Sequence, residues 1–76
     1  MSKKINSMIE VFKTNVVDRT QAERMLALLV THFNESRINF DMHDCDKILR
    51  VEASHIIPEK VIEVMNNHGY QCMVLE

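Results

Sequence analysis

The sequence predicts an α+β fold in which a four-stranded antiparallel sheet carries two helices on one face. Three observations lead to this prediction. Apolar and polar residues alternate in the middle of the chain, apolar residues recur every three or four positions in two other segments, and a single Pro and a single Gly bound the second of these. The elements therefore follow one another as strand, helix, strand, strand, helix, strand.

Length and composition indicate one small globular domain. The chain has 76 residues, of which 46% are hydrophobic and 26% charged. We expect a single domain over residues 1–76, with an ordered core at about 8–75 and flexible residues 1–7. The formal charge is −2 and Lys and Arg are scattered, so we expect no nucleic-acid partner. The longest apolar run, residues 25–30, is too short for a membrane span, and the start does not resemble a signal peptide. We therefore expect no membrane partner and a cytoplasmic location.

Residues 8–16 are expected to form the first strand, which is apolar on both faces. Ile9 and Val11 share one face with Lys13, and Met8 and Phe12 share the other. We place Ile9 and Val11 against the helices. Asp18 then has the features of a helix N-cap, and Gln21 stands where a capping box requires Glu or Gln. The helix should continue to about residue 34, with an apolar stripe formed by Ala22, Met25, Leu26, Leu29, Val30 and Phe33.

Residues 37–53 alternate twice and predict a β-hairpin. Ile38, Phe40 and Met42 occupy one face of its first strand, and Leu49, Val51 and Ala53 occupy one face of the second. Pairing Met42 with Leu49, Phe40 with Val51 and Ile38 with Ala53 places every apolar residue on one face. This register leaves residues 44–47 as the loop.

The second helix is expected to start at Pro58, because Pro is favoured in a first helical turn. Val61, Val64 and Met65 supply its buried stripe, and Gly69 stands where the helix end requires a positive φ. Residues 71–75 alternate again and predict a fourth strand. Its apolar residues fall on opposite faces, Cys72 and Val74 on one and Met73 and Leu75 on the other.

This order of elements is the ferredoxin-like βαββαβ pattern, for which we expect the sheet order 4-1-3-2 with both helices on one face. Chain direction then places three connections at one end of the sheet. They are residues 15–18, the hairpin tip at 43–47, and residues 67–70.

Residues 58–73, PEKVIEVMNNHGYQCM, resemble the last helix and strand of heavy-metal-associated domains, the family that includes copper chaperones. The resemblance implies the same fold. Members of that family bind metal through Met-x-Cys-x-x-Cys between the first strand and the first helix. Here Asn15 and Asp18 stand at the two cysteine positions and Lys13 at the Met position. The chain thus resembles a degenerate member, and its loop lacks the soft ligands that Cu(I) requires.

His43, Asp44, Cys45 and Asp46 form a candidate metal site at the hairpin tip, with His68 in a connection at the same end of the sheet. Thiolate, imidazole and carboxylate ligands suit Zn²⁺ or a similar divalent transition metal. The alternative is structural. Asp44 and Asp46 are residues that shape turns, Cys45 is then an ordinary small residue, and His68 interacts with the last carbonyls of its helix. Cys72 is expected in the core.

The sheet face opposite the helices is a second candidate site. Met8 and Phe12 on the first strand, Ile48 on the third, and Met73 and Leu75 on the fourth are expected to point outward. Such a patch favours contact with a protein partner or a second copy, although scattered exposed apolar residues are also ordinary. The third strand has no aromatic residue for stacking RNA bases.

These patterns favour a small, non-catalytic, cytoplasmic interaction module. The sequence has no phosphate-binding loop or nucleophile elbow, so we do not expect an enzyme. A zinc-like metal-binding protein is the main alternative. A small-molecule sensor, as in other regulatory ferredoxin-like domains, is a weaker one because no residue indicates an effector.

Overall fold

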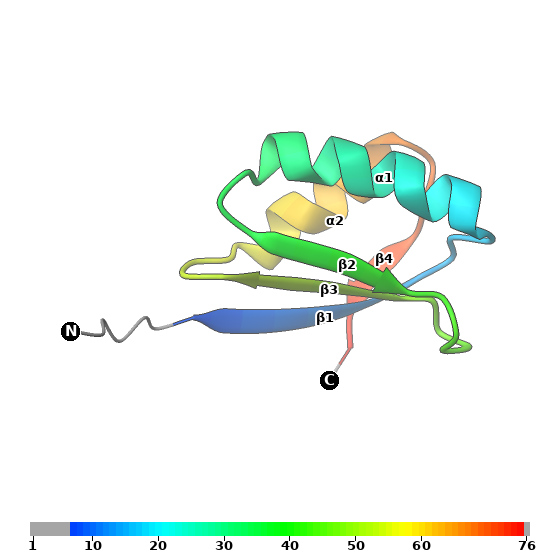
Figure 1. Cartoon of the computed structure of the whole chain (residues 1–76), viewed down its shortest axis with the longest axis horizontal. Helices are drawn as coiled ribbons and strands as arrows, with labels where there is room; N and C mark the ends of the chain where they lie inside the picture. The colour runs from blue at the N-terminus through cyan, green and yellow to red at the C-terminus, as the bar shows by residue number, and fades with distance from the viewer. Residues whose placement is uncertain (1–6, 76) are drawn as a thin grey trace.

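The computed structural model describes residues 7–75 and contains the six predicted elements in the predicted order. They are β1 (Met8–Thr14), α1 (Arg19–His32), β2 (Arg37–Asp41), β3 (Ile48–Ala53), α2 (Pro58–Asn67) and β4 (Cys72–Val74). The strands form one antiparallel sheet in the order β2-β3-β1-β4, and both helices lie on the same face (Figure 1). The ferredoxin-like α+β fold and the strand order are confirmed. The prediction of a flexible start falls largely on residues 1–6, outside the described residues.

α1 begins where its capping residues predict. The Asp18 side chain accepts a hydrogen bond from the Gln21 N–H at 2.9 Å. The Gln21 side chain reaches back, but it accepts from the N–H of Val17 at 2.9 Å, one residue before the cap. The two bonds satisfy backbone donors at the chain's entry into the helix, as in a capping box. The helix ends at His32, slightly before the predicted residue 34.

α2 ends in a Schellman motif. The Tyr70 N–H donates to the Met65 carbonyl at 3.0 Å, and the Gly69 N–H donates to the Asn66 carbonyl at 3.0 Å. Gly69 has a φ of +89°, which L-residues with a Cβ rarely adopt. The predicted reason for the glycine is confirmed, and the motif turns the chain toward β4.

The core lies between the sheet and the two helices. Ala22, Met25 and Leu29 from α1 and the predicted α2 stripe are buried in it. Val30 is the exception in the α1 stripe, because it is 43% exposed.

The predicted facing of β1 is wrong. Phe12 is fully buried and Ile9 is 52% exposed. Phe12 lies opposite Leu49, which is also fully buried, and directly paired residues in a sheet share a face. Phe12 therefore faces the helices with Thr14, while Ile9 faces away from them. Because this strand is apolar on both sides, its alternation alone did not determine which face is buried.

The hairpin register differs from the prediction by two residues. Phe40 pairs with Leu49 and Ile38 with Val51, whereas Met42 lies in the loop beyond β2. A shift of two residues keeps each side chain on its predicted face. The loop is longer than predicted and spans residues 42–47, because Asp41 Oδ1 accepts the His43 N–H at 3.1 Å as the chain leaves β2.

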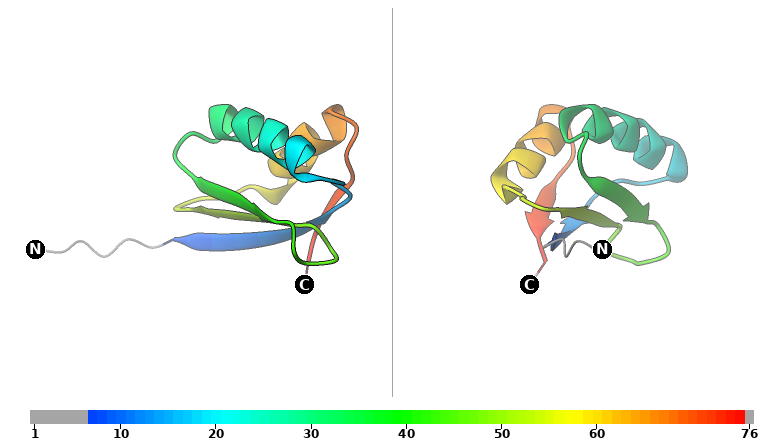
Figure 2. Two further views of the ribbon diagram at one scale, coloured as in Figure 1. Left: turned by 45° about the vertical axis from the view of Figure 1, so that its right-hand side comes forward. Right: turned by 60° about the vertical axis from the view of Figure 1, so that its left-hand side comes forward.

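Hydrogen bonds bring the three predicted connections together at one end of the sheet. Thr14 donates its N–H to Asp46 O at 3.1 Å and its hydroxyl to Lys47 O at 2.6 Å, which holds the hairpin loop beside the end of β1. The Gln71 N–H donates to Asn15 Oδ1 at 2.8 Å and links the β1–α1 connection to the approach to β4. Figure 2 shows these segments at the same end of the molecule. The predicted clustering is confirmed.

Candidate functional site

Three residues of the hairpin loop could supply ligands to one ion. A carboxylate oxygen of Asp44, the thiol of Cys45 and a carboxylate oxygen of Asp46 lie within 4.8 Å of one another. Asp44 and Cys45 are exposed, and Asp46 is half-buried. The loop thus brings together three of the five predicted metal-ligating residues.

The carboxylates of this group also have structural roles. Asp44 Oδ1 accepts the Asp46 N–H at 2.8 Å, and the Asp44 carbonyl accepts the Lys47 N–H at 3.0 Å. These bonds form the turn that the structural alternative predicts for an Asp at this position. The Lys13 ammonium lies 3.8 Å from Asp46 Oδ1, where its positive charge competes with a bound cation.

The two predicted histidine ligands stand apart from this group. His43 is exposed and lines a hollow between α1 and β2 with residues such as Arg19 and Glu23. His68 Nδ1 donates to the Val64 carbonyl at 3.0 Å, since a carbonyl only accepts. His68 lines a different hollow, between α1 and the turn that follows α2. The bond to the end of α2 is the one that the structural alternative predicts for His68.

Asn15 and Asp18, the two predicted degenerate loop positions, hold the backbone in place. Asn15 Oδ1 accepts the Gln71 N–H, and Asp18 Oδ1 accepts the Gln21 N–H. Both side chains use an oxygen to fix a neighbouring segment. Hydrogen bonding within the fold thus accounts for both residues.

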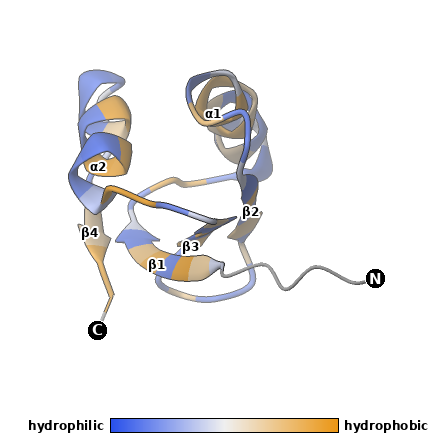
Figure 3. Cartoon of the chain, turned by 90° about the vertical axis from the view of Figure 1, so that its left-hand side faces the viewer, coloured by the Kyte–Doolittle hydropathy of each residue, from blue (hydrophilic) through white to orange (hydrophobic). Residues whose placement is uncertain are grey.

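The outer face of the sheet, opposite the helices, carries an apolar patch that is interrupted by Lys13, which pairs with Met73 and shares its face. We call it the outer patch, and its residues come from three neighbouring strands: Ile9, Val11, Ile48, Met73 and Leu75. Ile9, Met73 and Leu75 are 52%, 59% and 41% exposed. The Leu75 N–H donates to the Val11 carbonyl at 2.8 Å, which extends the pairing of β1 with the chain beyond β4. Figure 3 shows hydrophobic residues along β1 and at the end of β4.

Of the five residues predicted to face outward, three do so and two face the helices instead. Ile48, Met73 and Leu75 lie on the outer face as predicted. Phe12 belongs to the core, and Met8 shares its side of β1, although Met8 is 42% exposed at the strand's end. Ile9 and Val11 occupy the outer face in their place. The pairing of β1 with β3 would have identified them, because the facing of β3 was clear from its alternation.

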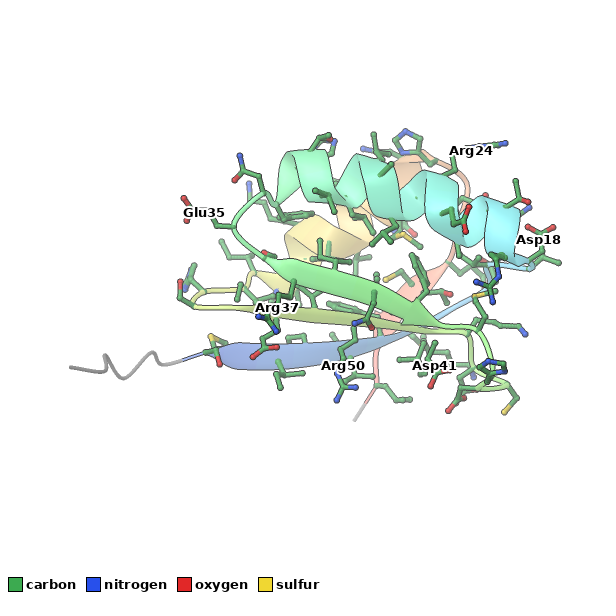
Figure 4. The ribbon with its side chains drawn as sticks, viewed as in Figure 1. Asp18, Arg24, Glu35, Arg37, Asp41 and Arg50 are labelled. Carbon is green, nitrogen blue, oxygen red and sulfur yellow. The ribbon has the colours of Figure 1, made fainter. Side chains whose placement is uncertain are left out.

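The other half of the outer face is charged. Arg37, Asn39 and Asp41 of β2 and Arg50 and Glu52 of β3 alternate with the residues that face the helices. Figure 4 shows Arg50 and Asp41 directed away from the helices. The outer face is therefore mostly apolar over β1 and β4, with Lys13 as the exception, and mostly charged over β2 and β3, with Ile48 as the exception.

Cys72, the second cysteine, is in the core as predicted. It lies on the helix face of β4, and burial raises its pKa to about 12, so the thiol stays protonated at neutral pH. A protonated, buried thiol is a poor metal ligand and nucleophile.

No family model, curated protein or solved structure matches the chain. Within residues 7–75, neither helix has the length and apolar character that crossing a membrane requires.

Proposed function

We propose that this chain is a non-catalytic interaction module of heavy-metal-associated-like fold, which binds a protein partner through the outer patch. The observation that carries the proposal is the group of neighbouring apolar side chains that β1 and β4 expose on the face opposite the helices: Ile9, Val11, Met73 and Leu75. Exposed apolar surface over neighbouring strands is typical of protein contact sites.

The two halves of the outer face indicate what the partner must present. Met73 and Ile9 are half-exposed or more and need an apolar surface to cover them. Arg50 belongs to the charged half and lies opposite Val11, so a carboxylate of the partner would pair with it at the rim of the contact. The partner we propose is therefore a folded protein with an apolar centre and an acidic edge. Such a division into apolar core and polar rim is usual in interfaces.

Site-directed cross-linking tests the proposal. A photoreactive phenylalanine analogue replaces Met73 in one variant and Thr20, an exposed α1 residue, in a control variant. In an extract of the source cells, we expect a discrete adduct from position 73 and none from position 20. Excess unmodified protein should suppress the adduct, and an Ile9→Ser/Leu75→Ser competitor should not. Equal adducts from both positions, or equal suppression by both competitors, would overturn the proposal.

A metal-binding protein is the second candidate function, favoured by the 4.8 Å grouping of Asp44, Cys45 and Asp46. Three ligands of this kind suit Zn²⁺ with a fourth position taken by water or a further side chain. Because the thiol must lose its proton to bind, affinity should rise with pH.

Cobalt(II) titration of the reduced protein tests the second candidate. Thiolate coordination gives a charge-transfer absorption that Cys45→Ser should abolish and His43→Ala should leave unchanged, because His43 is outside the group. An Asp44→Asn variant should weaken binding. If Cys45→Ser leaves the affinity unchanged, this candidate is wrong.

A further inference from the structure

One edge of the sheet is long enough to pair with another strand. β2 lies at the end of the strand order β2-β3-β1-β4 and within the described chain pairs with β3 alone. At the opposite edge, β4 has only three residues. Sheet edges are commonly protected by Pro, Lys or a bulge. β2 has the sequence RINFD, with neither Pro nor Lys, and its register to β3 is uninterrupted.

Two hydrogen bonds of β1 determine the direction of the backbone groups across the sheet. In an antiparallel sheet each residue points its N–H and C=O toward the same neighbour, and successive residues alternate. The Leu75 N–H donates to Val11 O, so the odd-numbered residues of β1 face β4. The Thr14 N–H donates to Asp46 O on the β3 side, so the even-numbered residues face β3.

The same alternation of backbone directions can be followed through β3 to β2, the strand at the free edge. Leu49 lies opposite an even-numbered β1 residue and faces β1, so Arg50 faces β2. Asn39 pairs with Arg50 and faces β3. Its neighbours Ile38 and Phe40 therefore point their N–H and C=O groups away from the sheet, where a further strand would bond to them.

The side chains of β2 are complementary to a second copy of the same strand. If two β2 strands run antiparallel about Asn39, Ile38 lies opposite Phe40 of the second copy, and these are the residues with free backbone groups. Arg37 of each copy then lies opposite Asp41 of the other copy, so the pairing contains two such pairs. Opposite charges in directly paired positions stabilise strand pairing. Moving the register by one pairing step in either direction loses this match of opposite charges.

α1 borders β2 with apolar side chains. The helix lies above the strand, on the helix face of the sheet (Figures 1 and 3). Leu26, Phe40 and Met42 line the hollow between α1 and β2, and all three are half-buried. Val30 follows Leu26 by one helical turn and is 43% exposed. A second copy placed at this edge would cover these side chains with its own.

We propose that two copies of this chain associate by antiparallel pairing of their β2 strands about Asn39, which makes one continuous sheet across the dimer. The symmetry is twofold and the contact isologous, so it closes at two copies. The proposal uses a different surface from the outer patch and stands independently of it. The twofold axis is perpendicular to the sheet, so both outer patches face the same side and remain accessible.

Charge reversal on β2 tests the pairing by sedimentation equilibrium over a range of protein concentrations. The Arg37→Glu variant puts a carboxylate opposite Asp41 of the second copy. The Asp41→Lys variant puts an ammonium opposite Arg37 of the second copy. Each single variant should self-associate roughly tenfold more weakly or worse, because two cross-strand pairs change from attraction to repulsion. An equimolar mixture of the two variants should recover association, because both pairs are attractive in the mixed dimer.

Matched controls separate the pairing from a general effect of charge. Lys60→Glu and Glu63→Lys change the net charge equally on exposed positions of α2 and should leave self-association unchanged. A native protein that stays monomeric at every concentration would overturn the proposal. So would a dimer that the β2 variants do not weaken, or a mixture that fails to recover it.

Amide hydrogen exchange tests whether the edge of β2 forms the contact between the two copies. Protection of the Ile38 and Phe40 amides should rise with protein concentration, while the Asn39 amide, which faces β3, is protected throughout. Protection of Ile38 and Phe40 that is independent of concentration would contradict edge pairing even if a dimer formed. The outer-patch proposal has a separate readout, since Arg37→Glu should leave the cross-link at position 73 intact.

Discussion

Replacing Phe12 with Ala tests the facing of β1, on which the outer patch depends. Phe12 is fully buried between the sheet and the helices. Truncating a buried Phe to Ala lowers the free energy of unfolding by about 3–5 kcal/mol. A domain of 76 residues has a total unfolding free energy of roughly 4–11 kcal/mol. Phe12→Ala should therefore remove a large fraction of the stability, and Phe12→Leu, at about 1–1.5 kcal/mol, gives a milder variant that stays folded.

Ile9 is the matched control, because it lies on the other face of the same strand and is 52% exposed. Ile9→Ala should cost about 1 kcal/mol or less, as expected for a half-exposed strand residue. Urea unfolding measures all three variants. With a slope of about 1–3 kcal/mol per M, a loss of 4 kcal/mol lowers the midpoint by roughly 1.3–4 M. A loss from Ile9→Ala equal to that from Phe12→Ala would refute the assignment of faces.

Four further predictions concern stability and thiol chemistry. Thr14→Val removes the hydroxyl that donates to Lys47 O and accepts from the Val16 N–H, and should lower the unfolding free energy by about 1–3 kcal/mol, measured in urea. Asp18→Ala should cost about 1 kcal/mol through loss of the α1 cap, with Asp18→Asn close to native as the control. Because the folded pKa of Cys72 is raised to about 12 from an ordinary value of 9.0, its contribution to stability is complete below pH 9. It should decrease as pH rises from 9 toward 12, and Cys72→Ala should abolish this component. An alkylating reagent at neutral pH should modify the exposed Cys45 in the native protein and Cys72 only after unfolding; equal rates would contradict the burial of Cys72.

Local signals predicted the elements of this fold well, because each was reinforced by a capping or breaking residue. Asp18 and Gln21 marked the start of α1, and Pro58 and Gly69 bounded α2. The strand order followed from the sequence of elements. In each case, short-range chemistry and the requirement for a buried face supported the same answer.

The errors arose where the choice depended on partners distant in sequence. β1 is apolar on both faces, so only its pairing with Leu49 determined that Phe12 is buried. The hairpin register shifted because Asp41 bonds to the His43 N–H and ends β2 before Met42. Neither the facing nor the end of a strand is determined by alternation alone.

The candidate sites were predictable to different degrees. The proximity of Asp44, Cys45 and Asp46 follows from their adjacency in the chain, whereas the separate positions of His43 and His68 required the fold. The charge complementarity of β2 depends on knowing which strand lies at the edge and which of its backbone groups are free.

Methyl NMR of the assembled complex tests whether the outer patch binds a protein. Labelled protein is titrated with the purified partner identified through position 73. We expect the methyl signals of Ile9, Ile48 and Leu75 to shift or broaden with saturation, while those of Val30 on α1 and Val61 on α2 stay unchanged. Changes confined to the helix methyls, with the outer-patch signals unaffected at saturation, would contradict the proposal.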